Sequence, residues 1–304
     1  MSAGDLLLQQ IINGLTIGSV YALIALGYTM VYGIIQLINF AHGEVFMVGA
    51  YLGFAAIVGF GVSQSGLGSV FLLLLVLALA AGGCSLLGLL IERVAYRPLR
   101  QAPKLSVLIT AIGVSFFLQN AVMLTFGPLD RYIPPIVPVI HWGNGSVGVT
   151  LMQMVIFVVS VSLMVGLQLM IYATPMGRAM RATAQDPLAA RLMGISVDKV
   201  IAVTFVIGSA LAGVGGVLFG LYYSTINFHD GYLTGLKAFT AAVLGGIGNI
   251  PGAMVGGLLL GLLEGLSAGY FSTQWKNVVA FLVLVLVLLF RPRGLLGERV
   301  ADRA

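Results

Sequence analysis

Long apolar windows without a charged side chain alternate with short polar segments along this chain. No Asp, Glu, Lys or Arg occurs in residues 45–91, 105–129, 132–177 or 200–228. A transmembrane helix needs about 20 consecutive apolar residues, so each window has room for one or two spans. The pattern predicts spans at residues 8–31, 43–61, 69–91, 105–126, 150–172 and 200–223, then a hairpin at 237–268 and a last span at 275–290.

The predicted fold is an all-α integral membrane protein with eight or nine transmembrane segments in a single domain, residues 1–304. The count depends on the hairpin at 237–268. Five residues break it near its middle: Gly245, Gly246, Gly248, Pro251 and Gly252. Such breaks are tolerated in membranes where neighbouring helices satisfy the freed backbone groups, and each arm of the hairpin is short for a full crossing.

The composition agrees with a membrane protein. Of the 304 residues, 59% are hydrophobic and 8% are charged, against roughly 25% charged in soluble domains. The net charge of +5 therefore does not indicate a nucleic-acid partner. The distribution of the basic residues along the chain instead predicts the orientation in the membrane. The positive-inside rule assigns three basic segments to the cytoplasm, with the N-terminus outside and the C-terminus inside. The segments contain Arg93, Arg97, Arg100 and Lys104; Arg178, Arg181, Arg191 and Lys199; and Arg291, Arg293, Arg299 and Arg303.

A faint internal repeat is visible. The segment after the first span reads "INFAHGEVFMVGAYLG" from Ile38, and the segment after the sixth reads "INFHDGYLTGLKAFTAAVLGG" from Ile226. Three identical residues also arise by chance. However, the first copy follows an inward span and the second an outward span, so an inverted repeat is predicted. Inverted repeats are common in transporters and place the pathway at the repeat interface.

A polar segment, residues 173–199, interrupts the apolar pattern with short predicted helices. Asp186 and Pro187 provide an N-cap and a first-turn proline, and Gly194 ends a helix of about seven residues. Such a helix is not stable alone in water, so it must dock on another surface. That surface is either a cytoplasmic partner or the membrane ends of the neighbouring spans. The side chains available for docking are Leu188, Leu192 and Met193, with Arg191 beside them.

Five polar residues near the apolar windows are candidates for a translocation pathway. His42, Glu44 and Glu264 are ionisable, and ionisable groups at membrane depth tend to face a cavity or a partner. For Glu44 the alternative is a helix start at the membrane interface, where the helix dipole favours an anion. Asn39 and Asn227, in the two repeat copies, offer amide groups either to a polar solute or to the start of a helix.

No catalytic site, metal site or cofactor is predicted. The stretch "GGIGNIPGAMVGG" from Gly245 lacks the G-x-x-x-x-G-K-[ST] pattern of a phosphate loop. His141, His229 and Asp230 do not have the spacing of a metal site. The lone Cys84 is interpreted as a packing residue. Small residues at every fourth position predict close helix packing; they are Gly14, Gly18 and Ala22, and Gly257, Gly261, Gly265 and Gly269.

Three stretches together resemble one family. They are "GLTIGSVYALIALGYTMVYGIIQLINFAHGEVFMVGAYLG", "RAMRATAQDPLAARLMGI" and "AFTAAVLGGIGNIPGAMVGGLLLGLLEG". In this order they are similar to LivH-type permeases of bacterial branched-chain amino-acid ABC importers, and the resemblance covers nearly the whole chain. It implies an inner-membrane subunit that pairs with a second, related permease, two cytoplasmic ATPases and an extracytoplasmic substrate-binding protein. The chain itself is then not an enzyme, because separate subunits hydrolyse ATP.

The resemblance also implies that the loop within 173–199 couples the permease to its ATPases. The residues implied for this role are Arg178, Arg181, Asp186, Pro187, Ala189, Ala190, Arg191 and Gly194. The loop departs from the broader permease signature, because Gln185 and Asp186 stand near the place of its Glu.

The predicted function is ATP-driven import of leucine, isoleucine, valine or related amino acids by alternating access. Permeases for urea or amides are similar in sequence, so that substrate class stays open. The inverted repeat and the membrane acids also fit an ion-driven secondary amino-acid transporter. A channel-like membrane protein is a third, weaker interpretation.

Overall fold

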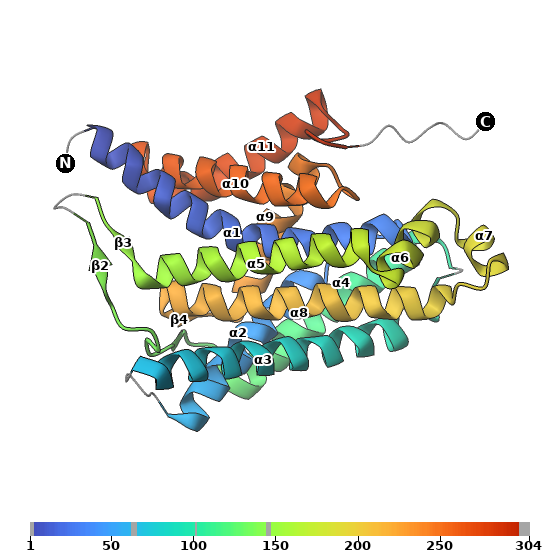
Figure 1. The fold of residues 1–304 in the computed structure, drawn as a ribbon, viewed down its shortest axis with the longest axis horizontal. Coiled ribbons are helices and arrows are strands. Elements are labelled where there is room, and N and C mark those ends of the chain that lie inside the picture. Colours follow the sequence, from blue (N-terminus) through green and yellow to red (C-terminus); the bar gives the residue numbers. More distant parts are fainter. Residues whose placement is uncertain (1–2, 62–65, 101, 144–146, 298–304) are drawn as a thin grey trace.

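The long helices of this computed structural model run along one axis of the molecule and form a bundle (Figure 1). The structure describes residues 3–61, 66–100, 102–143 and 147–297. Within them, eight helices are long and apolar enough to cross a membrane: α1, α2, α3, α4, α5, α8, α10 and α11. The predicted all-α membrane fold is confirmed.

The helices are α1 Ala3–Ile35, α2 His42–Phe60, α3 Gly66–Ile91, a π-helical turn η1 Glu92–Tyr96, α4 Lys104–Phe126, α5 Leu151–Ala173, α6 Pro175–Gln185, α7 Pro187–Leu192, α8 Val197–Tyr223, α9 Asp230–Gly245, α10 Ile250–Tyr270, a 3-10 turn η2 Thr273–Trp275 and α11 Lys276–Phe290.

Helix packing follows a twofold pattern that relates the two halves of the chain. Helix α1 packs along α10, and α8 packs along α3. Helix α2 contacts α3 and α8, whereas α9 contacts α10 and α1. Exchanging α1 with α8, α2 with α9 and α3 with α10 therefore reproduces the same neighbours. Because α1 and α8 run in opposite directions along the bundle (Figure 1), the arrangement is that of an inverted repeat, as predicted.

Small residues bring the paired helices into backbone contact. A Cβ atom added to Gly14 of α1 would lie 2.8 Å from the Cα of Leu262 on α10, and one added to Gly257 would lie 2.5 Å from the Cα of Ala22. In the equivalent pair, a Cβ at Gly213 of α8 would lie 2.8 Å from a backbone oxygen of α3. Such contacts stabilise helix pairs in membranes, and the predicted packing role of the spaced glycines is confirmed.

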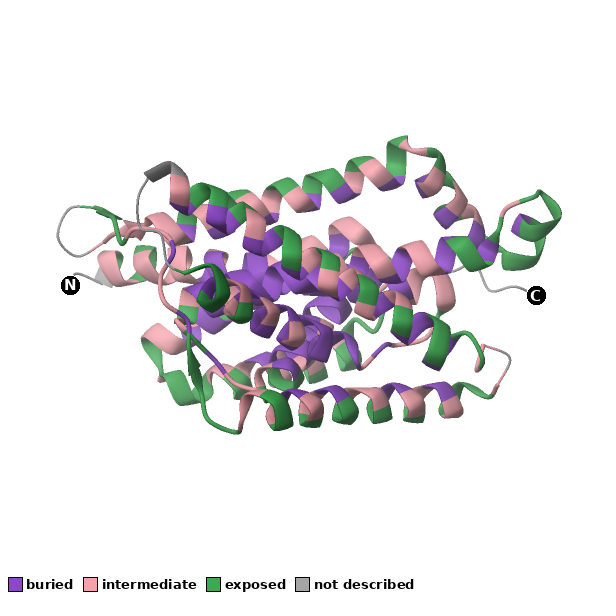
Figure 2. Cartoon of the chain, turned by 90° about the horizontal axis from the view of Figure 1, so that it is seen from below, coloured by how far each residue is buried: buried purple, intermediate pink, exposed green. Residues whose placement is uncertain are grey.

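Burial separates central helices from peripheral ones (Figure 2). In the most apolar window of each helix, 78% of α1 and 72% of α8 is buried, but only 22% of α4 and 6% of α11. The outer faces carry large apolar side chains such as Phe71, Phe117 and Leu124. The peripheral helices thus present surfaces suited to lipid or to another membrane subunit.

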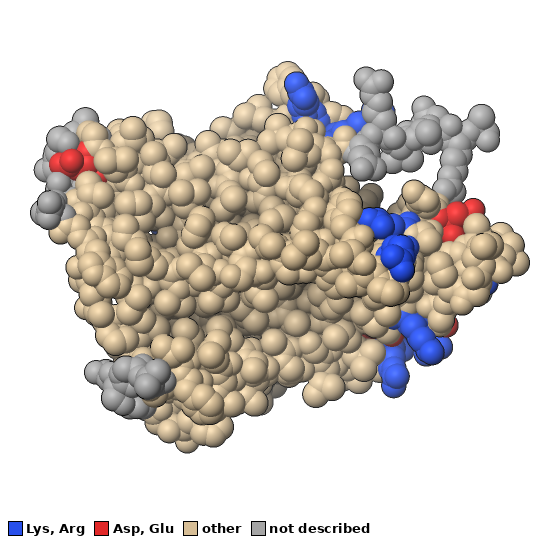
Figure 3. All heavy atoms as spheres, viewed as in Figure 1, with Lys and Arg blue, Asp and Glu red and all other residues tan. Residues whose placement is uncertain are grey.

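The two ends of the bundle differ in charge (Figure 3). Most of the described Lys and Arg lie at the end that carries α6 and α7, which we call the basic end. They lie on or next to η1, the start of α4, α6, α7, the start of α8 and the end of α11: Arg93, Arg97, Arg100, Lys104, Arg178, Arg181, Arg191, Lys199, Arg291 and Arg293. Arg299 and Arg303 lie outside the described residues. The opposite end carries two short antiparallel strand pairs, β1 Arg131–Tyr132 with β4 Thr225–Ile226 and β2 His141–Trp142 with β3 Val149–Thr150.

The predicted spans agree with the helices to within about five residues, except at the hairpin. It was expected at 237–268, but α9 already begins at Asp230, because a turn at Asn227 starts the helix earlier. The expected break is confirmed, since Gly246 and Gly248 adopt positive φ angles of 110° and 94°. Asn249 then caps α10 by accepting the N–H of residue 252 at 2.9 Å. With 16 residues, α9 is too short to span a membrane alone.

Candidate functional site

Each repeat contains a segment that turns back into the bundle before its second helix starts. After α1 ends at Ile35, the chain returns beside α1, and the first residue of α2, His42, packs its ring on Tyr28 with centroids 4.9 Å apart. Tyr28 lies about two helical turns before the end of α1, which places His42 roughly 10 Å inside that end. Helix α9 starts after an equivalent turn that follows α8. We call residues 36–41 and 224–229 the re-entrant segments.

Asn39 and Asn227 fold the two re-entrant segments in the same way. The Oδ1 of Asn39 accepts a hydrogen bond from the N–H of Ala41 at 3.1 Å. The Oδ1 of Asn227 accepts one from the N–H of His229 at 2.9 Å. In both copies the asparagine carbonyl also accepts the N–H of the first helical residue at 3.1 Å. Both asparagines therefore shape a helix start, which is one of the two predicted roles, and their shared geometry supports the repeat.

Side chains from the two loops that flank α4 hold these asparagines. At the basic end, the hydroxyl of Tyr96 donates to Asn39 Oδ1 at 3.0 Å, and both groups are buried. At the opposite end, Asn227 Nδ2 donates to Asp130 Oδ1 at 2.5 Å. The two re-entrant segments are thus fixed at opposite ends of the same helix.

The middle of α4 contacts the helices that follow the re-entrant segments. Ser115 donates to Glu44 on α2 at 3.2 Å. One turn further on, Gln119 Nε2 lies 2.8 Å from Nδ1 of His229, next to the start of α9. Helix α4 is otherwise little buried, and it adds apolar contacts to the core through Val107, Ala111, Leu118 and Val122.

The first turns of α2 and α9 cross in backbone contact. A Cβ at Gly43 would lie 2.8 Å from the Cα of Gly235 and would overlap the carbonyl oxygen of Gly231. A Cβ at Gly235 would in turn lie 3.2 Å from the hydroxyl of Tyr28. Two helix N-termini therefore meet inside the bundle, and the free N–H groups of each add positive potential there.

His42 and Glu44, two of the predicted pathway residues, are buried at this crossing. They are 2% and 1% exposed, so Glu44 does not lie on a surface at the helix start. The Oε2 of Glu44 and the Nε2 of His42 have no hydrogen-bond partner among the described residues. Buried polar atoms in proteins are nearly always paired, so Glu44 Oε2, which faces Gly231 of α9, is available to a polar solute or to water. The Nε2 of His42 instead packs against Gly27 of α1, where a Cβ would overlap it.

A cavity of about 230 Å³ opens beside the crossing, between α4 and α9; we call it the crossing cavity. Its wall is mainly apolar and aromatic and includes Tyr28, Phe40, Phe116, Tyr232 and Leu236. Ser115 and Gly231, which also line it, both adjoin Glu44. A largely apolar wall with a few polar groups is typical of sites for small molecules.

Glu264, the other membrane acid, forms a buried ion pair with Lys237. Lys237 Nζ lies 3.0 Å from Glu264 Oε1, and the hydroxyl of Tyr21 donates to Glu264 Oε2 at 2.8 Å. The pair joins α9 to α10 and, through Tyr21, to α1. Lys237 is not among the predicted site residues, because the apolar pattern puts it at the very start of the hairpin. Aligning the two repeat copies would have started α9 near Asp230 and put Lys237 well inside the helix.

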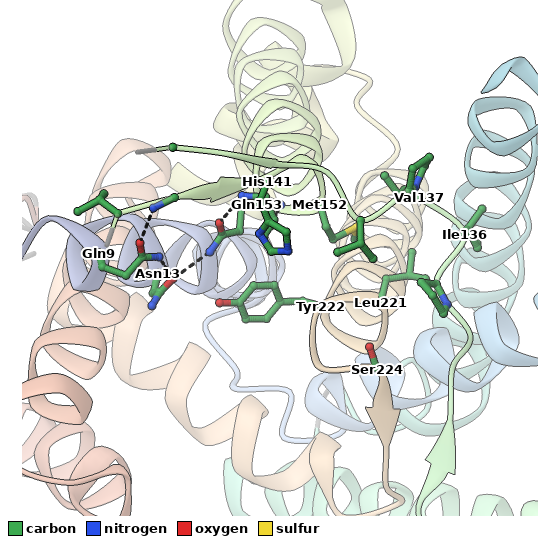
Figure 4. Close-up of a pocket in the computed structure, with 17 residues that line it drawn as sticks. Gln9, Asn13, Ile136, Val137, His141, Met152, Gln153, Leu221, Tyr222 and Ser224 are labelled. Carbon is green, nitrogen blue, oxygen red and sulfur yellow. Dashed lines mark hydrogen bonds between the residues drawn. The ribbon is translucent and has the colours of Figure 1, made fainter. Parts of the chain in front are cut away.

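A larger cavity, of about 660 Å³, lies at the opposite end of the bundle between α1, α5 and α8 (Figure 4). Gln9 and Gln153 both donate to Asn13 Oδ1 at its wall, at 3.2 and 2.9 Å. Tyr222 and Ser224 add hydroxyl groups (Figure 4). No Asp, Glu, Lys or Arg occurs among its described lining residues, so the chamber is polar and neutral.

The short helix predicted after Asp186 is present as α7. The Oδ1 of Asp186 accepts the N–H groups of Leu188 and Ala189 at 2.8 and 3.1 Å. Gly194 follows the helix with a φ of 83°, a conformation that disfavours other residues. Both signals predicted from the sequence, the cap and the terminating glycine, are therefore confirmed.

Helix α7 projects from the basic end of the bundle (Figures 1 and 2). Leu188, Leu192 and Met193 are 69%, 81% and 83% exposed, so its apolar side chains are not folded back on the neighbouring helices. Ala190 is buried, unlike the other residues that the resemblance implies for coupling. The exposed ones are Arg178, Arg181, Asp186, Pro187, Ala189, Arg191 and Gly194.

The described residues contain no group of three or more His, Cys, Asp or Glu that could hold a metal ion. Residues 265–269 match the G-x-S-x-G spacing of hydrolases, but Ser267 lies inside α10 and not at the strand-to-helix turn that this motif needs. Cys84 is fully buried, in agreement with a packing role.

Comparison with known proteins identifies related sequences. Residues 10–288 match the protein family described as "Branched-chain amino acid transport system / permease component". The chain is 55% identical over 302 residues to "High-affinity branched-chain amino acid transport system permease protein BraD" of Pseudomonas aeruginosa, with 97% of each chain covered. It is 52% identical over 305 residues to "High-affinity branched-chain amino acid transport system permease protein LivH" of Escherichia coli, again with 97% of each covered.

A shorter match reaches a second kind of permease. The chain is 30% identical over 142 residues to "Probable branched-chain amino acid transport permease protein LivM" of Methanocaldococcus jannaschii, which is 41% of each chain. The two long matches, in contrast, cover both repeats, both re-entrant segments and α6–α7.

Proposed function

The chain belongs to the family of branched-chain amino acid transport permease components, and we propose that it forms the membrane passage of an ATP-driven importer for leucine, isoleucine, valine or related amino acids. It is a multi-pass protein of the inner membrane. The observation that carries the ATP-driven part of the proposal is the exposed apolar surface of α7 at the basic end.

The proposed orientation places the basic end in the cytoplasm. Lys and Arg gather at this end, as expected for cytoplasmic loops. The N-terminus is then outside, the C-terminus is in the cytoplasm, and α7 faces the side where ATP is hydrolysed. The chain has no phosphate-binding loop of its own, so two separate ATPase subunits supply the energy. The 660 Å³ neutral chamber faces outward, where it receives the amino acid from a substrate-binding protein.

The proposed passage runs along the crossing cavity, in a complex with a second, related permease. Helix α4, which lines this cavity, is little buried in the single chain, as expected of a helix that faces a second subunit. Asn39 and Asn227 shape the two ends of the passage. Glu44 adjoins its wall through Ser115 and Gly231, and His42 packs behind the wall residue Tyr28. Glu264 is assigned to holding α9 in place, because Lys237 and Tyr21 occupy both of its carboxylate oxygens.

The source of energy separates this proposal from an ion-driven secondary transporter. The decisive experiment measures leucine uptake by the purified complex in vesicles, with ATP inside or with an imposed ion gradient. Uptake that needs ATP and the binding protein supports the proposal, whereas uptake that follows the gradient with no ATPase attached overturns it. Urea and an aliphatic amide, tested as competitors, decide the substrate class.

Replacing Leu192 with Asp is expected to weaken ATPase binding. Leu192 is 81% exposed on α7, and loss of an interface hot spot costs about 2 kcal/mol, or roughly 30-fold in Kd. The measurement is the amount of ATPase that co-purifies with the permease. Leu129→Asp is the matched control, because Leu129 is 76% exposed at the opposite end. Equal ATPase recovery from both variants would contradict a docking role for α7.

Cysteine labelling is expected to locate the passage on one face of α4. The native Cys84 is fully buried, so the parent protein provides an unreactive background. Gln119→Cys places a thiol in the crossing cavity, and a charged thiol reagent should modify it and block most uptake. Phe117→Cys, on an exposed face of the same helix, should stay unmodified in the membrane. Equal labelling of the two positions would place the passage elsewhere.

A further inference from the structure

An ion-pair cluster at the basic end joins the segment around α7, residues 173–199, to the first repeat. We call residues 173–199 the coupling segment. Arg100 Nη1 lies 2.6 Å from Oδ1 of Asp198, and its Nη2 pairs with Glu92 Oε1. Asp198 lies in the first turn of α8, directly after residues 173–196 and α7. Glu92 starts the π-helical turn η1. One guanidinium therefore bridges the two halves of the chain where the coupling segment enters the bundle.

The two contacts of Arg100 differ in strength. The side chain of Glu92 is 2% exposed, whereas that of Asp198 is 48% exposed. Separating a buried carboxylate from its cation costs a large free energy, because the charge is left buried and unpaired. An exposed ion pair contributes little to the free energy of folding. Arg100 therefore stays with Glu92, and the contact with Asp198 is the one that can form and break.

The other end of the same π-helical turn contacts the re-entrant segment at residues 36–41, which we call the inner re-entrant segment. Tyr96 is 2% exposed, packs on Phe205 of α8 with ring centroids 5.0 Å apart, and donates to Asn39 Oδ1 at 3.0 Å. Asn39 in turn accepts the N–H of Ala41 just before α2. Single π-helical turns are frequent at functional positions, and this one joins Asp198 to the start of α2 through three side-chain contacts: Arg100 with Asp198, Arg100 with Glu92, and Tyr96 with Asn39.

We propose that Arg100 is the positioning residue that transmits the displacement of the coupling segment to the inner end of the passage. The inference rests on the proposed function, since it needs ATPases that move α7. When α7 moves, Asp198 moves with the first turn of α8. Arg100 passes this movement to η1 through Glu92, and Tyr96 passes it to Asn39 and so to the inner re-entrant segment. The planar fork of arginine suits this role because it holds two carboxylates at fixed angles.

The test uses two conservative variants that cut the connection at different places. Asp198→Asn removes the carboxylate charge that Arg100 contacts and leaves the buried Glu92–Arg100 pair intact. Tyr96→Phe removes only the hydroxyl and keeps the ring on Phe205. The control is Arg97→Gln, because Arg97 also contacts Asp198, at 3.4 Å, but its side chain is 54% exposed. Among the described residues Arg97 meets Glu92 only through its backbone N–H, which the substitution keeps.

The readout is the number of leucine molecules imported per ATP hydrolysed, measured with the complete transporter in vesicles. Both variants are expected to lower this ratio about tenfold, a typical size for a coupling between two sites. The double variant should be no worse than either single variant, because both interrupt the same connection. Arg97→Gln should keep the ratio of the parent protein.

A purely structural role gives a different result. It would lower the yield of assembled complex, ATP hydrolysis and uptake together, and would leave their ratio unchanged. An unchanged ratio in intact Asp198→Asn and Tyr96→Phe complexes overturns the inference alone. Uptake by the parent protein without an ATPase overturns the proposed function and this inference together.

Discussion

Lys237→Met is expected to lower the free energy of unfolding by about 3–5 kcal/mol, the usual effect of removing one partner of a buried ion pair. Glu264 would keep the hydrogen bond from Tyr21 but would lose the cation 3.0 Å away. Its side chain is 4% exposed, so the variant would leave a buried carboxylate without its cation. The measurement is the fraction of detergent-purified protein that stays monodisperse after heating.

A double variant separates the loss of the pair from the loss of its components. Lys237→Met combined with Glu264→Met removes both charges, and such replacements are often neutral. We therefore expect the double variant to regain most of the lost stability. Lys276→Met is the matched control, since Lys276 forms no ion pair within the described part of the chain. A double variant as unstable as Lys237→Met would show that Lys237 acts by packing and not by charge.

The apolar windows of the sequence were sufficient to predict most of the fold. Each uncharged run longer than about 20 residues became one or two membrane helices, because a lipid environment leaves few other choices to the backbone. The helix signals at Asp186 and Gly194 likewise act locally, so the position of α7 followed from the sequence alone. Local rules therefore sufficed wherever the structure depends on neighbours along the chain.

The re-entrant segments show where local rules fail. The sequence predicts the start of α2, with His42 and Glu44, to within one residue, but it leaves open whether Glu44 lies at the membrane interface. Their depth depends on Tyr28, against which His42 packs, and on the crossing with α9. The contact between Tyr96 and Asn39 joins residues 57 positions apart. Such pairs are set by how the two repeats pack on each other, and no pattern along a single sequence encodes them.

The internal repeat in the sequence also contains the information needed to locate the start of α9. The two copies of "INF" start the same turn, with equivalent hydrogen bonds at Asn39 and Asn227. Applying the geometry of the first copy to the second places Lys237 in the middle of α9. Glu264, on the next helix of the same hairpin, then becomes its natural partner. A weak repeat is therefore more useful for locating helix starts than for counting spans.

Gly43→Val is expected to abolish uptake, because the crossing of α2 and α9 has no room for a side chain. A Cβ at this position would lie 2.8 Å from the Cα of Gly235, closer than backbone atoms tolerate. The helices would have to separate, and overpacking of a dense interior costs about 1–3 kcal/mol. The larger effect is on transport, since the crossing positions Glu44 next to Gly231 in the cavity wall. Leucine uptake in vesicles measures this loss.

Gly59→Val on the same helix is the matched control, because a Cβ at Gly59 meets no atom within 4 Å. It changes the same residue type to the same side chain, but near the other end of α2 and away from α9. We expect it to keep assembly and uptake close to those of the parent protein. If Gly43→Val assembles normally and transports as well as Gly59→Val, the contact between the two helix starts is not needed for passage, and the solute must cross the membrane by another route through the complex.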